Sequence, residues 1–99
     1  MAIMQFTKDR DWDQFHSPAN LAKSIVIESA ELLECFQWSN KYDKEKVYME
    51  LADVANYVIL LADKLDVDLE DIILKKIEEN SKKYPISESK GNSKKYTEL

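Results

Sequence analysis

The residues between Pro18 and Pro85 include no glycine and no further proline, because the single glycine of this chain is Gly91. A stretch without these helix breakers is strongly permissive for helices. The sequence shows no strand-like alternation of useful length and no internal repeat. We therefore predict an all-α fold, an antiparallel bundle of about four helices with short connections.

The length of 99 residues predicts one domain, residues 1–99. A monomer of this size buries roughly 60–65% of its unfolded surface, so its core is modest. The two tryptophans and five tyrosines suggest that self-association adds to this burial. We therefore expect the bundle to be completed by oligomerisation.

Apolar spacing, capping residues and prolines predict four helices, over residues 7–15, 20–38, 44–65 and 68–84. Thr7, Asn20 and Asp68 are the predicted caps, with the aspartates near Thr7 as alternatives for the first helix. Pro85 ends the fourth helix, because proline disfavours helical backbone at the residue before it. The polar residues 86–99 are predicted to form an extended tail.

Composition excludes several classes of protein. The net charge of −5 argues against a general nucleic-acid binder, which requires a basic field. The longest apolar stretch, residues 54–62, is about half of the ~20 residues that span a bilayer, and the N-terminus lacks a signal-peptide pattern. The single cysteine, Cys35, cannot form an internal disulfide. We expect a soluble cytoplasmic protein without a membrane partner.

Two acidic motifs occupy the middle of the chain: Glu28-x-x-Glu31 and, after a gap of eighteen residues, Glu50-x-x-Asp53. A spacing of three residues places both carboxylates of a motif on one helix face. Both motifs lie in apolar runs, and Lys46 is the only basic residue one turn from any of the four acids. Two such helices packed together would crowd four carboxylates, and a hard divalent cation relieves that repulsion. The pattern predicts a Mg²⁺ site between two helices.

The acidic motifs have alternative interpretations, as a solvated helix face or as a site for another metal. One such motif alone is usually the solvated stripe of an amphipathic helix, and two on consecutive helices leave both interpretations open. A ferritin-like site would use histidines on the helices, but the only histidine, His16, lies outside both motifs. Zinc would need cysteine or histidine ligands in one place. Oxygen ligands suit Mg²⁺, Mn²⁺ or Ca²⁺, and Mg²⁺ is commonly completed by substrate phosphates.

A phosphorylated substrate would be held without a glycine-rich loop, since the sequence has none. The candidate phosphate contacts are Lys82, Lys83, Lys90, Lys94 and Lys95, with the hydroxyls of Tyr84 and Tyr96. Aromatic side chains near the motifs are candidates for stacking on a nucleobase: Trp12, Phe15, His16, Phe36, Trp38 and Tyr57. Asn56, Gln37 or His16 would then read the base edge. Core packing for the aromatics and simple solvation for the lysines are the alternatives.

The two acidic motifs resemble the signature of the MazG-like all-α nucleotide pyrophosphohydrolases. Residues 10–16, 36–38 and 76–85 are similar to the dCTP pyrophosphatase branch of that family, and the matching blocks span about residues 6–96. The link between the two motif helices is short, so a longer loop that would shape the pocket is missing.

The resemblance implies hydrolysis of a nucleoside triphosphate, dCTP or a related pyrimidine, to the monophosphate and pyrophosphate, which is nucleotide-pool housecleaning. It implies a homodimer or homotetramer, Mg²⁺ with Mn²⁺ as a substitute, and Glu28 or Glu31 as the general base. The implied metal ligands are Glu28, Glu31, Glu50 and Asp53, and the implied substrate-binding residues are Trp12, His16, Trp38, Tyr57, Asn80, Lys83 and Tyr84. A non-catalytic helical oligomerisation module, and a pyrophosphohydrolase for a different base, are the alternatives.

Overall fold

The computed structural model describes residues 1–91, 93 and 97. Within these residues every regular element is a helix and none is a strand, which confirms the predicted all-α fold. The chain divides into two compact units, residues 1–67 and 68–99, and we describe each by itself. None of the described helices is both long and apolar enough to cross a bilayer.

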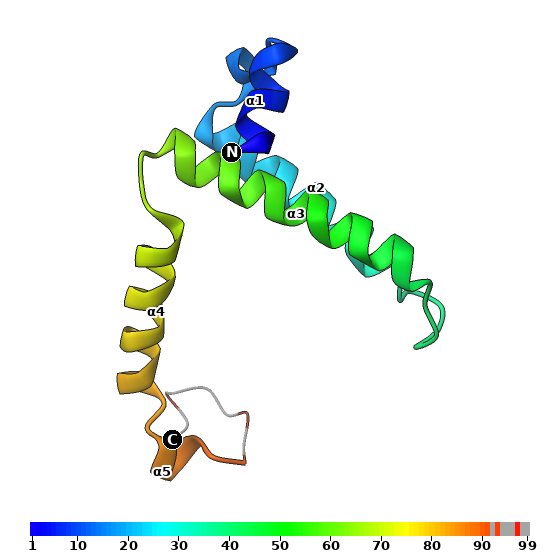
Figure 1. Ribbon diagram of the computed structural model, residues 1–99. Coiled ribbons are helices and arrows are strands. Elements are labelled where there is room, and N and C mark those ends of the chain that lie inside the picture. The colour runs from blue at the N-terminus through cyan, green and yellow to red at the C-terminus, as the bar shows by residue number, and fades with distance from the viewer. Residues whose placement is uncertain (92, 94–96, 98–99) are drawn as a thin grey trace. The chain divides into compact units, whose positions relative to one another are not determined.

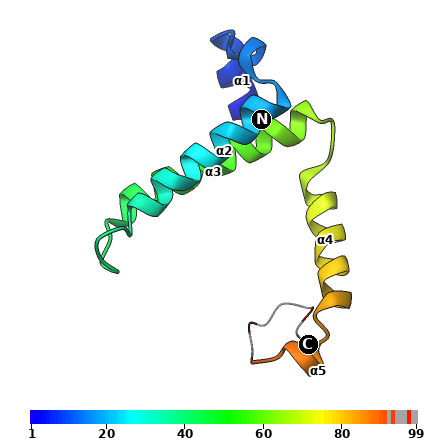
Figure 2. The same cartoon turned by 180° about the vertical axis from the view of Figure 1, so that it is seen from behind.

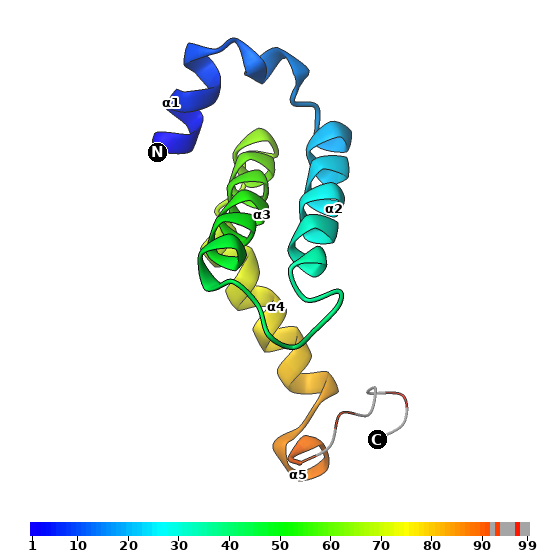
Figure 3. The same ribbon diagram turned by 90° about the vertical axis from the view of Figure 1, so that its right-hand side faces the viewer.

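The first unit is built on two long helices, α2 (Pro18–Glu34) and α3 (Lys44–Lys64), joined by residues 35–43. They run antiparallel and side by side, as Figures 1 and 3 show from two directions and Figure 2 shows from behind. Leu21 of α2 is fully buried, and Leu60 near the end of α3 is almost so. This end of the pair therefore holds the small core of the unit.

The predicted helix over residues 7–15 is wrong, because the N-terminal segment forms two shorter elements. They are α1 (Ala2–Asp9) and the 3₁₀ helix η1 (Trp12–Phe15). Thr7 caps nothing: its side chain is buried within α1, and its hydroxyl donates to the carbonyl of Met4 at 2.9 Å. The helical conformation is interrupted at Asp11, whose φ of 55° lies in the left-handed region that a right-handed helix excludes.

The helix predicted over residues 20–38 begins and ends earlier, as α2. Ser17 caps it, because its hydroxyl oxygen accepts a hydrogen bond from the Asn20 N–H at 3.1 Å, and Pro18 follows at the first helical position. The predicted cap, Asn20, instead donates its side-chain amide to the carbonyl of Phe15 at 3.0 Å. The helix ends at Glu34, and in the loop that follows the Phe36 and Tyr42 rings lie 4.8 Å apart.

The third predicted helix, residues 44–65, agrees with α3 to within one residue. Asp43 caps α3 by accepting hydrogen bonds from the N–H groups of Glu45 and Lys46 at 3.0 and 3.3 Å. Near its other end, Lys64 pairs with Asp13 of η1 at 3.1 Å. This ion pair and the contacts of α1 with α3 hold the N-terminal elements against the helix pair.

The second unit contains α4 (Leu69–Lys83) and the short α5 (Ile86–Ser89). Asp68 caps α4 as predicted, accepting a hydrogen bond from the Asp71 N–H at 3.1 Å. The prediction of an extended tail is wrong for residues 86–89, because the carbonyl of Pro85 accepts hydrogen bonds that begin a helical turn. The oligomeric state and the single domain stay predictions.

Candidate active site

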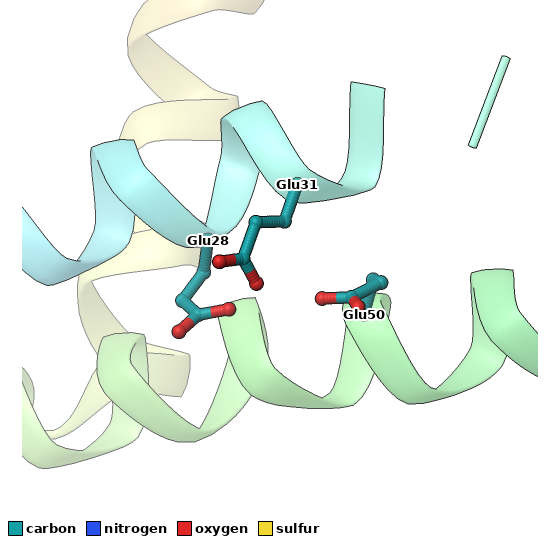
Figure 4. A group of neighbouring side chains, drawn as sticks. All are labelled: Glu28, Glu31 and Glu50. Carbon is teal, nitrogen blue, oxygen red and sulfur yellow. The ribbon is translucent and has the colours of Figure 1, made fainter. Parts of the chain in front are cut away.

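Three of the four predicted metal ligands meet in the space between α2 and α3. Glu28 and Glu31 project from α2 and Glu50 from α3, and their carboxylates point toward one another (Figure 4). One carboxylate oxygen from each side chain lies within 4.8 Å of the other two. We call Glu28, Glu31 and Glu50 the carboxylate cluster. The two motifs therefore meet through three of the four predicted carboxylates.

The carboxylate cluster is electrostatically unfavourable without a counter-charge. The Oε2 atoms of Glu28 and Glu50 are covered, and neither has a hydrogen-bond partner among the described residues. Burial, followed by the hydrogen bond and the negative charge of Glu31, raises the pKa of Glu28 from 4.5 to about 7. Burial and the charge of Glu31 also raise the pKa of Glu50. Protons or a cation would each relieve this arrangement.

The cluster fits a hard divalent cation. Two oxygens that share one Mg²⁺ are at most about 4.2 Å apart, twice the ~2.1 Å Mg–O distance. A group within 4.8 Å reaches that range by small side-chain rotations. Asp53, one turn after Glu50, is exposed and does not belong to this group, although its charge raises the pKa of both Glu28 and Glu50. Its oxygen therefore lies close enough to influence a bound ion.

An aromatic cavity of about 470 Å³ begins at Asp53, one turn beyond Glu50 along α3. Trp12 and His16 from the N-terminal segment and Tyr57 from α3 line it, with Asp53 and Asn56. The His16 and Tyr57 rings meet edge to face at 6.4 Å, and His16 Nδ1 is covered without a hydrogen-bond partner in the described chain. The cavity therefore offers ring faces together with one covered, unpaired polar atom of His16.

Trp38, which was predicted with these residues, does not line the aromatic cavity. It lies in the 35–43 loop, at the other end of the helix pair, and 89% of it is exposed. Asn80, Lys83 and Tyr84 belong to the second unit, where Lys83 pairs with Glu79 at 3.2 Å. Their part in the site stays a prediction, as does that of Lys82 and Lys90. Lys94, Lys95 and Tyr96 lie outside the described residues.

A second cavity, which sequence reasoning missed, adjoins the opposite side of the cluster. It measures about 550 Å³ and is lined by Glu31 and Glu50 together with residues of the 35–43 loop and the start of α3. Lys41 and Lys46 supply its positive charge. Lys46 lies four residues before Glu50, so helical spacing alone indicated that the two share a face of α3. We call this the lysine cavity.

The fold and the site define a class of all-α proteins in which two antiparallel helices hold an acidic cluster between them. Within this class, the model of the MazG-like family matches residues 23–99. The chain belongs to the MazG-like family, and the predicted resemblance is confirmed.

Individual relatives agree with this assignment. The chain is 38% identical to dCTP pyrophosphatase 1 of Mus musculus and 37% identical to that of Homo sapiens, over 105 residues in each case. Each alignment covers 96% of this chain but 62% of the relative, so the chain spans less than two thirds of their length. A pyrophosphatase from Archaeoglobus fulgidus, known from its crystal structure, is 39% identical with a TM-score of 0.77, and the match covers 85% of this chain and 86% of that one.

Proposed function

We propose that this protein is a Mg²⁺-dependent nucleoside triphosphate pyrophosphohydrolase. The observation that carries this proposal is the carboxylate cluster, which lies between an aromatic cavity and a cavity that contains lysines. A nucleotide has an aromatic base at one end and phosphates at the other. The three neighbouring sites offer a matching environment for the base, a cation and phosphate groups.

The relatives and the aromatic cavity support the choice of substrate class. The mammalian relatives are named dCTP pyrophosphatases, and the chain resembles them over 96% of its length. Trp12 and Tyr57 provide faces on which a base stacks, while His16 and Asn56 provide hydrogen-bonding groups for its edge. We therefore propose dCTP, or a related pyrimidine triphosphate, as the substrate, and removal of unwanted nucleotides as the role.

Glu28, Glu31 and Glu50 would hold the metal, with Asp53 beside them. When bound, Mg²⁺, or Mn²⁺ in its place, supplies positive charge that offsets the charge of the phosphates. The carboxylate oxygens of these residues suit either ion and do not suit a soft metal. This chemistry explains why the chain keeps crowded acids in a partly buried position.

Hydrolysis breaks the bond between the α and β phosphates and adds water across it, so one proton must leave the attacking water. Glu28 or Glu31 would accept that proton as the general base. Both side chains come from one turn of α2, with carboxylates close enough to share a hydrogen bond. Trp12, His16 and Tyr57 would hold the base so that the phosphates lie over these carboxylates.

The decisive assay measures pyrophosphate release from a panel of nucleoside triphosphates, with Mg²⁺ and with chelator. We expect release that needs Mg²⁺ and is fastest with dCTP or another pyrimidine. Glu50→Gln should abolish release, while Glu45→Gln, an exposed acid on the same helix outside the cluster, should retain it. Wild-type protein that releases nothing from any triphosphate would leave the non-catalytic module as the better description.

We also propose that the protein is a homodimer or homotetramer of the cytoplasm. Apolar side chains of the first unit are exposed on α2 and α3: Val26, Ile27, Leu33, Met49 and Leu51. Cys35, which forms no disulfide in the described chain, agrees with a reducing compartment. Light scattering after size exclusion tests the assembly, and a monomer at all concentrations would contradict it.

A further inference from the structure

We propose that the lysine cavity is the site of the β- and γ-phosphates, the part of the substrate that leaves as pyrophosphate, and that Lys41 and Lys46 are its binding residues. This inference rests on the proposed function and gives the substrate a direction across the site. The base occupies the aromatic cavity, and the phosphate tail points toward the 35–43 loop.

Four side chains along α3 connect the two cavities. Lys46, Glu50, Asp53 and Tyr57 follow one another at spacings of four, three and four residues, so they form one stripe on the helix. At ~1.5 Å per residue, the stripe runs roughly 16 Å along the helix axis. Tyr57 lines the aromatic cavity and Lys46 the lysine cavity. A nucleotide that crosses the cluster from the aromatic cavity therefore arrives at Lys46.

The residues that line the lysine cavity include groups that bind an anion. Its positive groups are the ammonium groups of Lys41 and Lys46, and neither is within 4.0 Å of an acidic partner among the residues that the structure describes. Tyr42, whose hydroxyl can donate a hydrogen bond, is also among the lining residues. Two unpaired ammonium groups beside a cation site are suited to a polyanion, which accepts charge-assisted hydrogen bonds from both.

The charge balance of the lysine cavity predicts an order of binding. Four acids line it, Glu31, Glu34, Asp43 and Glu50, against the two lysines, so its formal charge is −2. An anion is repelled from such a cavity until a divalent cation joins the cluster. Pyrophosphate should therefore bind in the presence of Mg²⁺ and should not bind in the presence of a chelator.

The test is titration calorimetry of pyrophosphate into the full chain with Mg²⁺. The variant Lys41→Ala/Lys46→Ala should lose roughly tenfold or more in pyrophosphate affinity, because two charge-assisted contacts are removed. Lys23→Ala/Lys44→Ala is the matched control, since it removes two lysines of α2 and α3 that do not line the cavity. Replacement of both cavity lysines by arginine should restore most of the affinity, because the charge returns.

Two further measurements separate the phosphate tail from the rest of the site. Mn²⁺ affinity, followed by electron paramagnetic resonance, and the affinity for the nucleoside monophosphate product should both be unchanged in Lys41→Ala/Lys46→Ala. Equal pyrophosphate affinity in this variant and the control would overturn the inference while leaving the proposed function in place. A general loss of Mn²⁺ and monophosphate binding would also overturn it, since the lysines would then support the structure of the whole site.

Measurements of turnover test the proposed function, and measurements of pyrophosphate binding test the role of the two lysines. In an active enzyme, the double variant should raise KM for the triphosphate, with the melting temperature unchanged because both lysines are exposed. If the wild-type protein hydrolyses no triphosphate, the proposed function fails. The calorimetric comparison of pyrophosphate binding would still test the lysines in that case.

Discussion

Replacing Glu28 by glutamine should stabilise the metal-free protein. The folded environment raises the pKa of Glu28 to about 7 from its ordinary 4.5, through burial and then through Glu31. At 1.36 kcal/mol per pKa unit, this shift corresponds to at most about 3 kcal/mol of lost stability at pH 8. Because the cluster is partly open to water, screening reduces the expected gain for the neutral side chain to roughly 1 kcal/mol.

The pH dependence of this gain follows from proton linkage. Between about pH 4.5 and 7, the folded state holds a proton on Glu28 that the unfolded state has lost. Stability of the wild type therefore falls as pH rises through this window and is level above it. The advantage of Glu28→Gln should be small at pH 4.5, grow toward pH 7 and then stay constant.

The assay is urea unfolding, followed by circular dichroism, of both proteins in chelator from pH 4.5 to 8. A gain of 1 kcal/mol should also raise Tm by about 4–8 °C in a domain of this size. Glu78→Gln, an exposed glutamate of α4 outside the cluster, is the control and should change stability by less than about 0.5 kcal/mol. A Glu28→Gln protein that is less stable than the wild type at pH 8, or a gain independent of pH, would refute the reasoning.

Three further predictions concern the metal, a cap and the core. Mg²⁺ at a hundred times its dissociation constant should stabilise the wild type by about 2.7 kcal/mol, and no Tm shift at millimolar Mg²⁺ would count against the cation site. Ser17→Ala should lose about 1 kcal/mol in urea unfolding, because α2 loses its side-chain cap, whereas Ser17→Asp should be close to the wild type; equal losses would exclude the capping explanation. Leu21→Ala should cost about 2–5 kcal/mol, because its side chain is fully buried, and an unchanged unfolding midpoint would contradict its place in the core.

The sequence predicted correctly those helix ends that depend on neighbouring residues. Asp68 and Pro85 bracket α4 through local chemistry, since one accepts a backbone hydrogen bond and the other disfavours helix before it. The prediction that Thr7 caps the first helix was wrong, because Thr7 is buried within α1 despite its preference for capping positions. The early end of α2 was not predicted, because residues 35–37 contain neither glycine nor proline.

The candidate site likewise has one part that the sequence predicted and one part that it did not. The carboxylate cluster was predictable, since the spacing within each motif fixes a helix face and consecutive helices pack together. The lysine cavity was not found, because Lys41 reaches it only through the path of the 35–43 loop. The predicted phosphate contacts were lysines near the C-terminus, although Lys46 lies one turn from Glu50.

The stripe of Lys46, Glu50, Asp53 and Tyr57 makes α3 intolerant of insertions. One extra residue within it would rotate everything beyond by about 100° and turn Tyr57 away from the acids. A change in the length of the 35–43 loop would leave this phase unchanged and would instead move Lys41 relative to the acids. Variants that accept other nucleotides should therefore be sought by substituting residues that line the aromatic cavity, with the length of α3 kept unchanged.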